Sequence, residues 1–128
     1  MIALVATVLS PPAHAQNGLS AESVDVFLDC GRGCDQSYIK REISYVNYVR
    51  DRTNANVHLL VTSERTGSGG QSYELNFIGL KEFSALSDTL VYTSSGTDTG
   101  DERRSGLTRK IEEGLVRYVS RTSISERM

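Results

Sequence analysis

The sequence predicts an α+β fold, a two-layer α/β sandwich in which two helices lie on one face of a mixed sheet. Short β-branched runs predict four strands, and apolar residues at helical spacing predict two helices, in the order β-α-β-β-β-α. A helix between the first two strands makes those strands parallel, while the short links that follow favour an antiparallel meander. Both helices are expected to cover the same face of this sheet.

The first third of the domain is predicted to form a strand, a turn and then a helix. Residues 24–29 are rich in β-branched side chains, and the segment Cys30–Cys34 then turns the chain. Either Asp35 or Ser37 can cap the helix that follows, which is expected to fade over residues 51–56. Its apolar stripe comprises Ile39, Ile43, Val46 and Val49.

The middle of the chain is predicted to form the antiparallel meander. Residues 57–62 and 73–78 alternate in polarity and flank the glycine-rich segment Thr66–Gly70, which is typical of an antiparallel hairpin. Residues 89–93 predict the fourth strand. The face of the sheet without helices needs a lid, a partner or enough polar side chains, and Asp25, His58, Glu74 and Asn76 are the residues that would supply the last.

The last helix has a clear start signal. Thr99 and Glu102 form a capping box, in which each side chain accepts from the other residue's backbone N–H. Glycine inside a helix costs about 1 kcal/mol relative to alanine, so Gly106 and Gly114 indicate a close approach to the sheet. The predicted buried face comprises Leu107, Ile111, Leu115 and Tyr118.

The first fifteen residues predict export. An apolar run, a double proline and the small-residue motif Ala13-His14-Ala15 are typical of a secretory signal peptide, although no basic residue precedes the run. We therefore expect a signal peptide over 1–15, a loose mature N-terminus over 16–22, one domain over 23–120 and a polar tail over 121–128. The expected location is the periplasm or the periplasmic face of the outer membrane.

The two cysteines are the strongest candidate site. In an oxidising compartment Cys30 and Cys34 are expected to form a structural disulfide, and glycines at 31 and 33 ease so tight a loop. A redox-active pair is the alternative, because thiols at a helix N-terminus have a lowered pKa. The C-x-x-x-C spacing and the absence of proline after residue 12 depart from the thioredoxin pattern. A metal site is disfavoured since His58 would be the one histidine left after cleavage.

Other site patterns are weak, and no catalytic residue, metal site or cofactor is predicted. The loop Thr66, Gly67, Ser68, Gly69 and Gly70 lacks the Lys-Ser/Thr and the helix that a phosphate-binding P-loop requires, so it is interpreted as a hairpin tip that contacts a partner or ligand. The acidic stretch 98–102 lacks a calcium-loop pattern. A formal charge of −2 without a basic face gives no indication of nucleic-acid binding.

Five segments resemble an uncharacterised family of bacterial cell-envelope proteins: 45–52, 57–62, 66–70, 75–79 and 114–118. The element order is also similar to that of the N-terminal α/β domain of TolB, a likeness of fold that transfers no active site. The family resemblance implies a domain that precedes a longer C-terminal region, expected to form an outer-membrane β-barrel. Such a downstream domain, or another envelope protein, is the expected partner, and membrane association would come through that region.

These observations favour a non-catalytic accessory or interaction domain of the cell envelope. Two alternatives stay open. One is a thiol-disulfide oxidoreductase that uses Cys30 and Cys34, and the other is a module that binds a small ligand or glycan through the glycine-rich hairpin.

Overall fold

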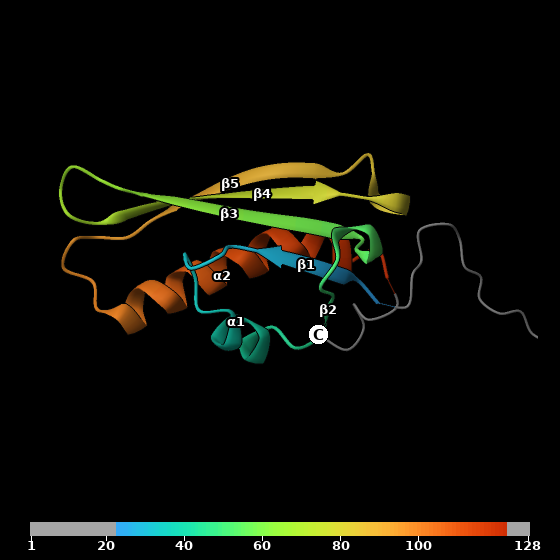
Figure 1. Ribbon diagram of the computed structural model, residues 1–128, viewed down its shortest axis with the longest axis horizontal. Coiled ribbons are helices and arrows are strands. Elements are labelled where there is room, and N and C mark those ends of the chain that lie inside the picture. Colours follow the sequence, from blue (N-terminus) through green and yellow to red (C-terminus); the bar gives the residue numbers. More distant parts are fainter. Residues whose placement is uncertain (1–22, 123–128) are drawn as a thin grey trace, which may run out of the picture.

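The computed structural model describes residues 23–122, which form a five-stranded sheet and two helices (Figure 1). The predicted signal peptide, the loose segment 16–22 and residues 123–128 of the predicted tail lie outside the described residues. The elements are β1 (Asp25–Asp29), α1 (Gln36–Glu42), β2 (Asn47–Tyr48), η1 (Arg52–Asn54), β3 (Val57–Arg65), β4 (Gln71–Gly79), η2 (Lys81–Phe83), β5 (Ser87–Thr93) and α2 (Gly100–Val119).

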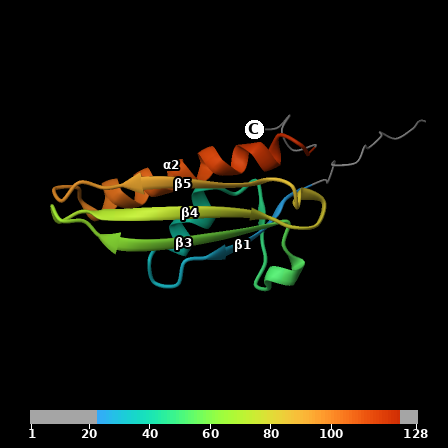
Figure 2. The same cartoon turned by 90° about the horizontal axis from the view of Figure 1, so that it is seen from above.

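The sheet is mixed, as the sequence predicts, with the strand order β2-β1-β3-β4-β5. β1 pairs in parallel with β3, and β3, β4 and β5 form an antiparallel meander that lies side by side in Figure 2. The segment between β3 and β4 is the predicted link Thr66–Gly70. In Figure 1 both helices lie on the same side of the sheet, so the two-layer α+β fold is confirmed.

The predicted first helix is wrong in its second half. Asp35 caps α1 by accepting from the Tyr38 backbone N–H, but the helix ends at Glu42. The chain then extends and forms β2, where the Asn47 and Val49 N–H groups donate to the carbonyls of Val24, just before β1, and Val26, within β1. The apolar spacing fits both conformations, and the β-branched and aromatic side chains of residues 43–49 prefer the extended one. β2 is therefore an edge strand absent from the predicted order.

The last helix follows the prediction closely. Thr99 caps α2 in a capping box with Glu102. The predicted face of Leu107, Ile111, Leu115 and Tyr118 is buried. A Cβ at Gly106 would lie 2.1 Å from the Tyr92 hydroxyl, and one at Gly114 would lie 2.2 Å from the Phe77 ring, so both glycines permit the close approach of helix to sheet.

The core lies between the sheet and the helices. Alternate side chains of the three central strands point into it, following the two-residue period of a strand. Their buried members are Val26, Leu28, Val57, Leu59, Val61, Tyr73, Leu75 and Phe77. Within residues 23–122 the structure contains no helix long and apolar enough to cross a bilayer.

Candidate functional site

The β1–α1 junction is closed by a disulfide between Cys30 and Cys34, whose Cα atoms are 6.0 Å apart. The loop turns at Gly31, which has a φ of +48°, and the Gly33 N–H donates to the Cys30 carbonyl at 2.7 Å. Cys30 is 6% exposed, so one sulfur of the bridge belongs to the core. The disulfide therefore joins the end of β1 to the start of α1.

Two adjoining cavities open beside this loop. The first, of about 530 Å³, lies between the disulfide loop and the first turns of α2. The second, of about 430 Å³, continues toward the β3–β4 hairpin and includes Arg65 and Gly69 in its lining. In Figure 1 the hairpin and the start of α2 diverge toward this end of the molecule. Both cavities are lined by Arg32, Gly33, Tyr73 and Arg103, and we call the combined space the arginine cleft.

One arginine of the cleft, Arg104, pairs with two carboxylates through its terminal nitrogens. Arg104 bonds to the carboxylates of Asp35, at 3.0 Å, and Asp101, and its guanidinium lies 4.6 Å from the centroid of the Tyr38 ring. The Tyr38 backbone N–H and the Arg104 guanidinium together hold the pKa of Asp35 below its ordinary value of 3.8. Arg104 thus links the start of α1 to the first turn of α2 and pairs with both acidic residues that line the cleft.

The other three arginines of the cleft are not engaged. Within residues 23–122, the structure gives no ion pair or hydrogen bond to the side chains of Arg32, Arg65 and Arg103. Tyr73 lines both cavities, and its ring stacks on that of Tyr92, with centroids 5.9 Å apart. The cleft therefore carries a surplus of positive charge around a tyrosine.

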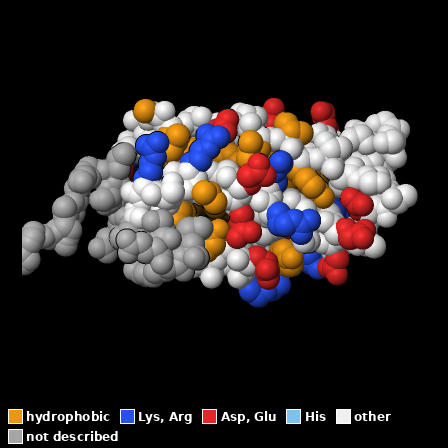
Figure 3. Space-filling model, turned by 180° about the vertical axis from the view of Figure 1, so that it is seen from behind, with side chains coloured by type: hydrophobic (Ala, Val, Ile, Leu, Met, Phe, Trp, Pro, Cys, Tyr) orange, Lys and Arg blue, Asp and Glu red, His pale blue; other side chains and the backbone are white. Residues whose placement is uncertain are grey.

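The predicted hairpin segment forms the outer rim of this end. The Thr66 side chain accepts from the Gly70 N–H, and the Gly69 N–H donates to the Thr66 carbonyl, which closes the tip. The backbone of Gly96, in the β5–α2 loop, packs against the tip. In Figure 3 the outermost part of this end is white, because backbone and uncharged polar side chains form it, and acidic side chains lie next to it. The structure therefore brings Cys34 and the hairpin tip, predicted as separate sites, to one end.

The face of the sheet without helices holds a second polar group. His58 is 8% exposed, its Nε2 lies 2.9 Å from an Asp29 carboxylate oxygen, and its ring lies 5.0 Å from that of Phe27. Sequence reasoning missed this pair because the two residues lie on different strands. Among the described residues, no three His, Cys, Asp or Glu side chains come together as a metal site would require. His58 is thus a packed histidine whose Nε2 has a hydrogen-bond partner in Asp29, as is usual for buried polar groups.

Comparison with known proteins leaves the family open. No known family profile matches the chain, and no curated protein matches its sequence. Among solved structures, it is similar to the solution NMR structure of uncharacterized lipoprotein B from Nitrosomonas europaea. That likeness has a TM-score of 0.31 and 14% sequence identity, and it covers 84% of this chain and 80% of the other. Nothing about function follows from a likeness of this size.

Proposed function

We propose that this chain is an exported, non-catalytic accessory domain of the bacterial cell envelope that acts by binding a partner. The Cys30–Cys34 disulfide carries the proposal, because such bonds persist in oxidising compartments and are rare in the cytosol. The resemblance to the uncharacterised envelope family and to the TolB N-terminal domain belongs to the same proposal. So does a partner that is either another envelope protein or a further domain of the same polypeptide.

The position of the disulfide favours a structural role over thiol exchange. Exchange requires a thiolate to reach one of the two sulfurs. Cys30 is 6% exposed and packs in the core, and Cys34 is only partly exposed. A redox enzyme would place a reactive sulfur at the surface. The bond is thus better suited to bracing the domain.

The hairpin tip is the proposed contact surface. Its residues are short and polar, and Ser68 in the middle of the link between β3 and β4 is exposed. Serine and glycine offer adaptable hydrogen bonding at recognition surfaces. The second cavity, which Gly69 of the tip helps to line, favours small-ligand binding as a second candidate function.

The export part of the proposal is tested by mass spectrometry of the full-length chain expressed in a Gram-negative host. The expected product is a periplasmic protein that begins at Gln16 and has resisted alkylation at both cysteines. A product that keeps Met1, or that reacts at two free thiols before reduction, would contradict it. Catalysis of insulin reduction that is lost in Cys30→Ser would instead establish the oxidoreductase.

The contact surface is tested by placing a photo-cross-linking amino acid at Ser68 in living cells. The matched control is Ser44, an exposed serine just after α1 that is not part of the hairpin. We expect a discrete cross-linked species from position 68 and none from position 44. Equal labelling at the two positions, or none at 68, would remove the hairpin from the proposal.

A further inference from the structure

The arginine cleft concentrates cationic side chains that have no counter-ion within the described part of the chain. Four arginines and two aspartates line the two cavities, and Arg104 already holds both aspartates. The side chains of Arg32, Arg65 and Arg103 all line the second cavity, where Arg32 and Arg65 are exposed and Arg103 is half-buried. A planar guanidinium is suited to binding phosphate or carboxylate through paired hydrogen bonds. The missing element is therefore an anion.

Tyr73 supplies an independent sign of a ligand. It is 5% exposed and lines both cavities, yet no hydrogen bond to its hydroxyl occurs among the described residues. The one fully buried side-chain N or O atom without a partner in that region is Arg104 Nε, so the Tyr73 hydroxyl keeps contact with the cavity. Buried tyrosine hydroxyls usually find a partner. Burial raises the pKa of Tyr73, so its hydroxyl stays protonated and can donate.

We propose that the arginine cleft binds the phosphate monoester group of an organic ligand, with Arg32, Arg103 and Tyr73 as donors. A phosphate monoester carries close to two negative charges and three acceptor oxygens, which matches this donor set better than a carboxylate does. The second cavity, which contains Arg65, receives the rest of the ligand. A volume of about 530 Å³ for the first cavity alone lies within the range of small-molecule sites, about 300–1,000 Å³.

The first turn of α2 borders the cleft through Gly100 and Asp101. Because that turn carries the carboxylates of Asp101 and Glu102, the positive charge of the cleft comes from its arginines. This site stands whether or not the domain is exported, since none of its residues depends on the compartment. A phosphate monoester reaches such a site either as a free small molecule or as a lipid headgroup.

The test is calorimetric titration of the intact oxidised protein at an ionic strength of about 0.15 M, where the Debye length is about 8 Å. One arm uses glycerol phosphate, and the other uses phosphatidylcholine vesicles with and without phosphatidic acid, whose headgroup is the same phosphate monoester. Saturable binding in either arm supports the site, and the stronger arm identifies the source of the ligand. No saturable binding in both arms would overturn it.

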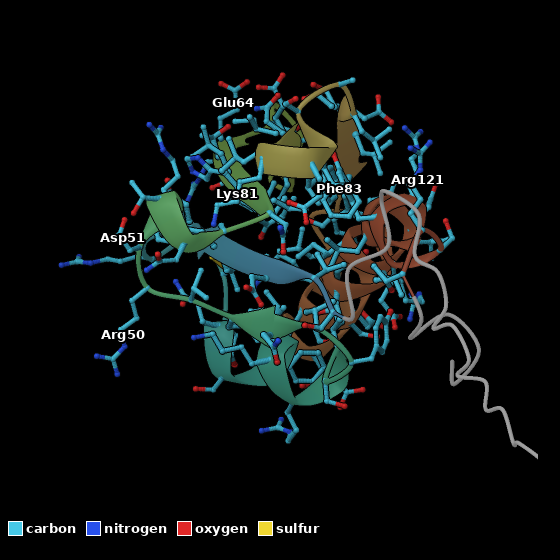
Figure 4. All side chains as sticks on the ribbon, turned by 90° about the vertical axis from the view of Figure 1, so that its right-hand side faces the viewer. Arg50, Asp51, Glu64, Lys81, Phe83 and Arg121 are labelled. Atoms are coloured by element: carbon cyan, nitrogen blue, oxygen red, sulfur yellow. A yellow bond between two sulfur atoms is a disulfide. The ribbon has the colours of Figure 1, made fainter. Side chains whose placement is uncertain are left out.

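Three variants make the test specific to the cleft. Removing one charged hydrogen bond should raise Kd about tenfold in Arg103→Gln, and loss of the hydroxyl in Tyr73→Phe about threefold to tenfold. The matched control is Arg50→Gln, because Arg50 is exposed and points away from the molecule at the other end (Figure 4). Its Kd should stay at the wild-type value. If Arg50→Gln weakened binding as much as Arg103→Gln, attraction by net charge would replace the site.

Discussion

The two ends of the sandwich are built differently. At the end seen in Figure 4, Phe83 lies between the sheet and α2, with its ring 5.5 Å from that of Tyr118 in an edge-on contact. The Tyr118 hydroxyl donates to the Leu86 carbonyl at 2.7 Å, and Val24 and Val119 are fully buried nearby. At the other end the same layers enclose the arginine cleft.

Helix α2 spans both ends, and the burial of its residues differs between them. Its buried residues begin at Gly106 and continue to Val119, so its first six residues have no place in the core. Those residues are held by the capping box of Thr99 and by the ion pairs of Arg104. Apolar burial therefore stabilises one end of the domain, while a disulfide, a cap and charge pairs hold the end that is open to a ligand.

The largest stability loss is expected at the packed end. Phe83→Ala should lower the free energy of unfolding by about 3–5 kcal/mol, because it deletes a fully buried ring and leaves a cavity beside Tyr118. Urea unfolding followed by circular dichroism measures this loss of unfolding free energy. Phe27→Ala is the control, since Phe27 is only partly buried on the helix-free face and should cost less. Equal losses would mean that the packed end is not the main source of stability.

The disulfide should give the largest effect at the cleft end. A loop closed over four positions restricts the unfolded chain by about 2 kcal/mol, so Cys30→Ser with Cys34→Ser should lose that amount. Wild-type protein unfolded in the presence of reductant provides an independent measurement of the same quantity. Because Arg32 lies inside the closed loop, the double variant should also bind glycerol phosphate more weakly. Unchanged stability would show that the bond does not brace the junction.

The helix cap should contribute less. Thr99→Ala removes the side-chain acceptor of the Glu102 N–H and should cost about 1 kcal/mol. Thr99→Ser keeps a hydroxyl at the same position and is expected to retain most of the stability. Thermal unfolding of the wild type and the two variants under the same conditions measures these differences in stability. A serine variant as unstable as the alanine variant would attribute the loss to the threonine methyl group instead.

Much of the fold could be predicted because its signals are local. The capping box at Thr99, the stripe from Leu107 to Tyr118 and the glycine-rich link before Gln71 each depend on neighbours in sequence. The length of α1 could not be predicted, since the spacing of Ile43 and Val46 suits a helix as well as the extended segment. Pairing with β1 decided between them, and that contact is not local.

The cleft depends on contacts between distant segments. Sheet register places Arg65 opposite Gln71 and Ser63 opposite Tyr73, and the disulfide loop and α2 then bring Arg32 and Arg103 over them. In sequence, Arg32 stands between two glycines and Arg103 follows a capping residue, so each has an ordinary local explanation. The cysteines and the hairpin were identified from sequence because each forms a motif by itself.

The smallest expected effect concerns the ion pairs at the cleft end, and it appears as a dependence on pH and salt. The folded-state pKa of Asp35 is lowered, so its contribution to stability is present above the ordinary value of 3.8 and is lost as the pH falls through the lowered pKa. Asp35→Asn keeps a capping side chain but loses the charge facing Arg104. Its stability deficit should therefore be constant above pH 3.8, shrink below it and diminish with added salt.

Asp51→Asn is the matched comparison for Asp35→Asn at the other end of the molecule. The pKa of Asp51 is also lowered, but chiefly by the backbone N–H and hydroxyl of the neutral Thr53. The loss of stability in Asp51→Asn should depend on pH in the same direction but respond less to salt, because Asp51 makes no ion pair among the described residues that salt could screen. Denaturant unfolding at several pH values and two salt concentrations separates the two variants. Equal salt responses would mean that Arg104 does not hold α1 to α2 through its charge.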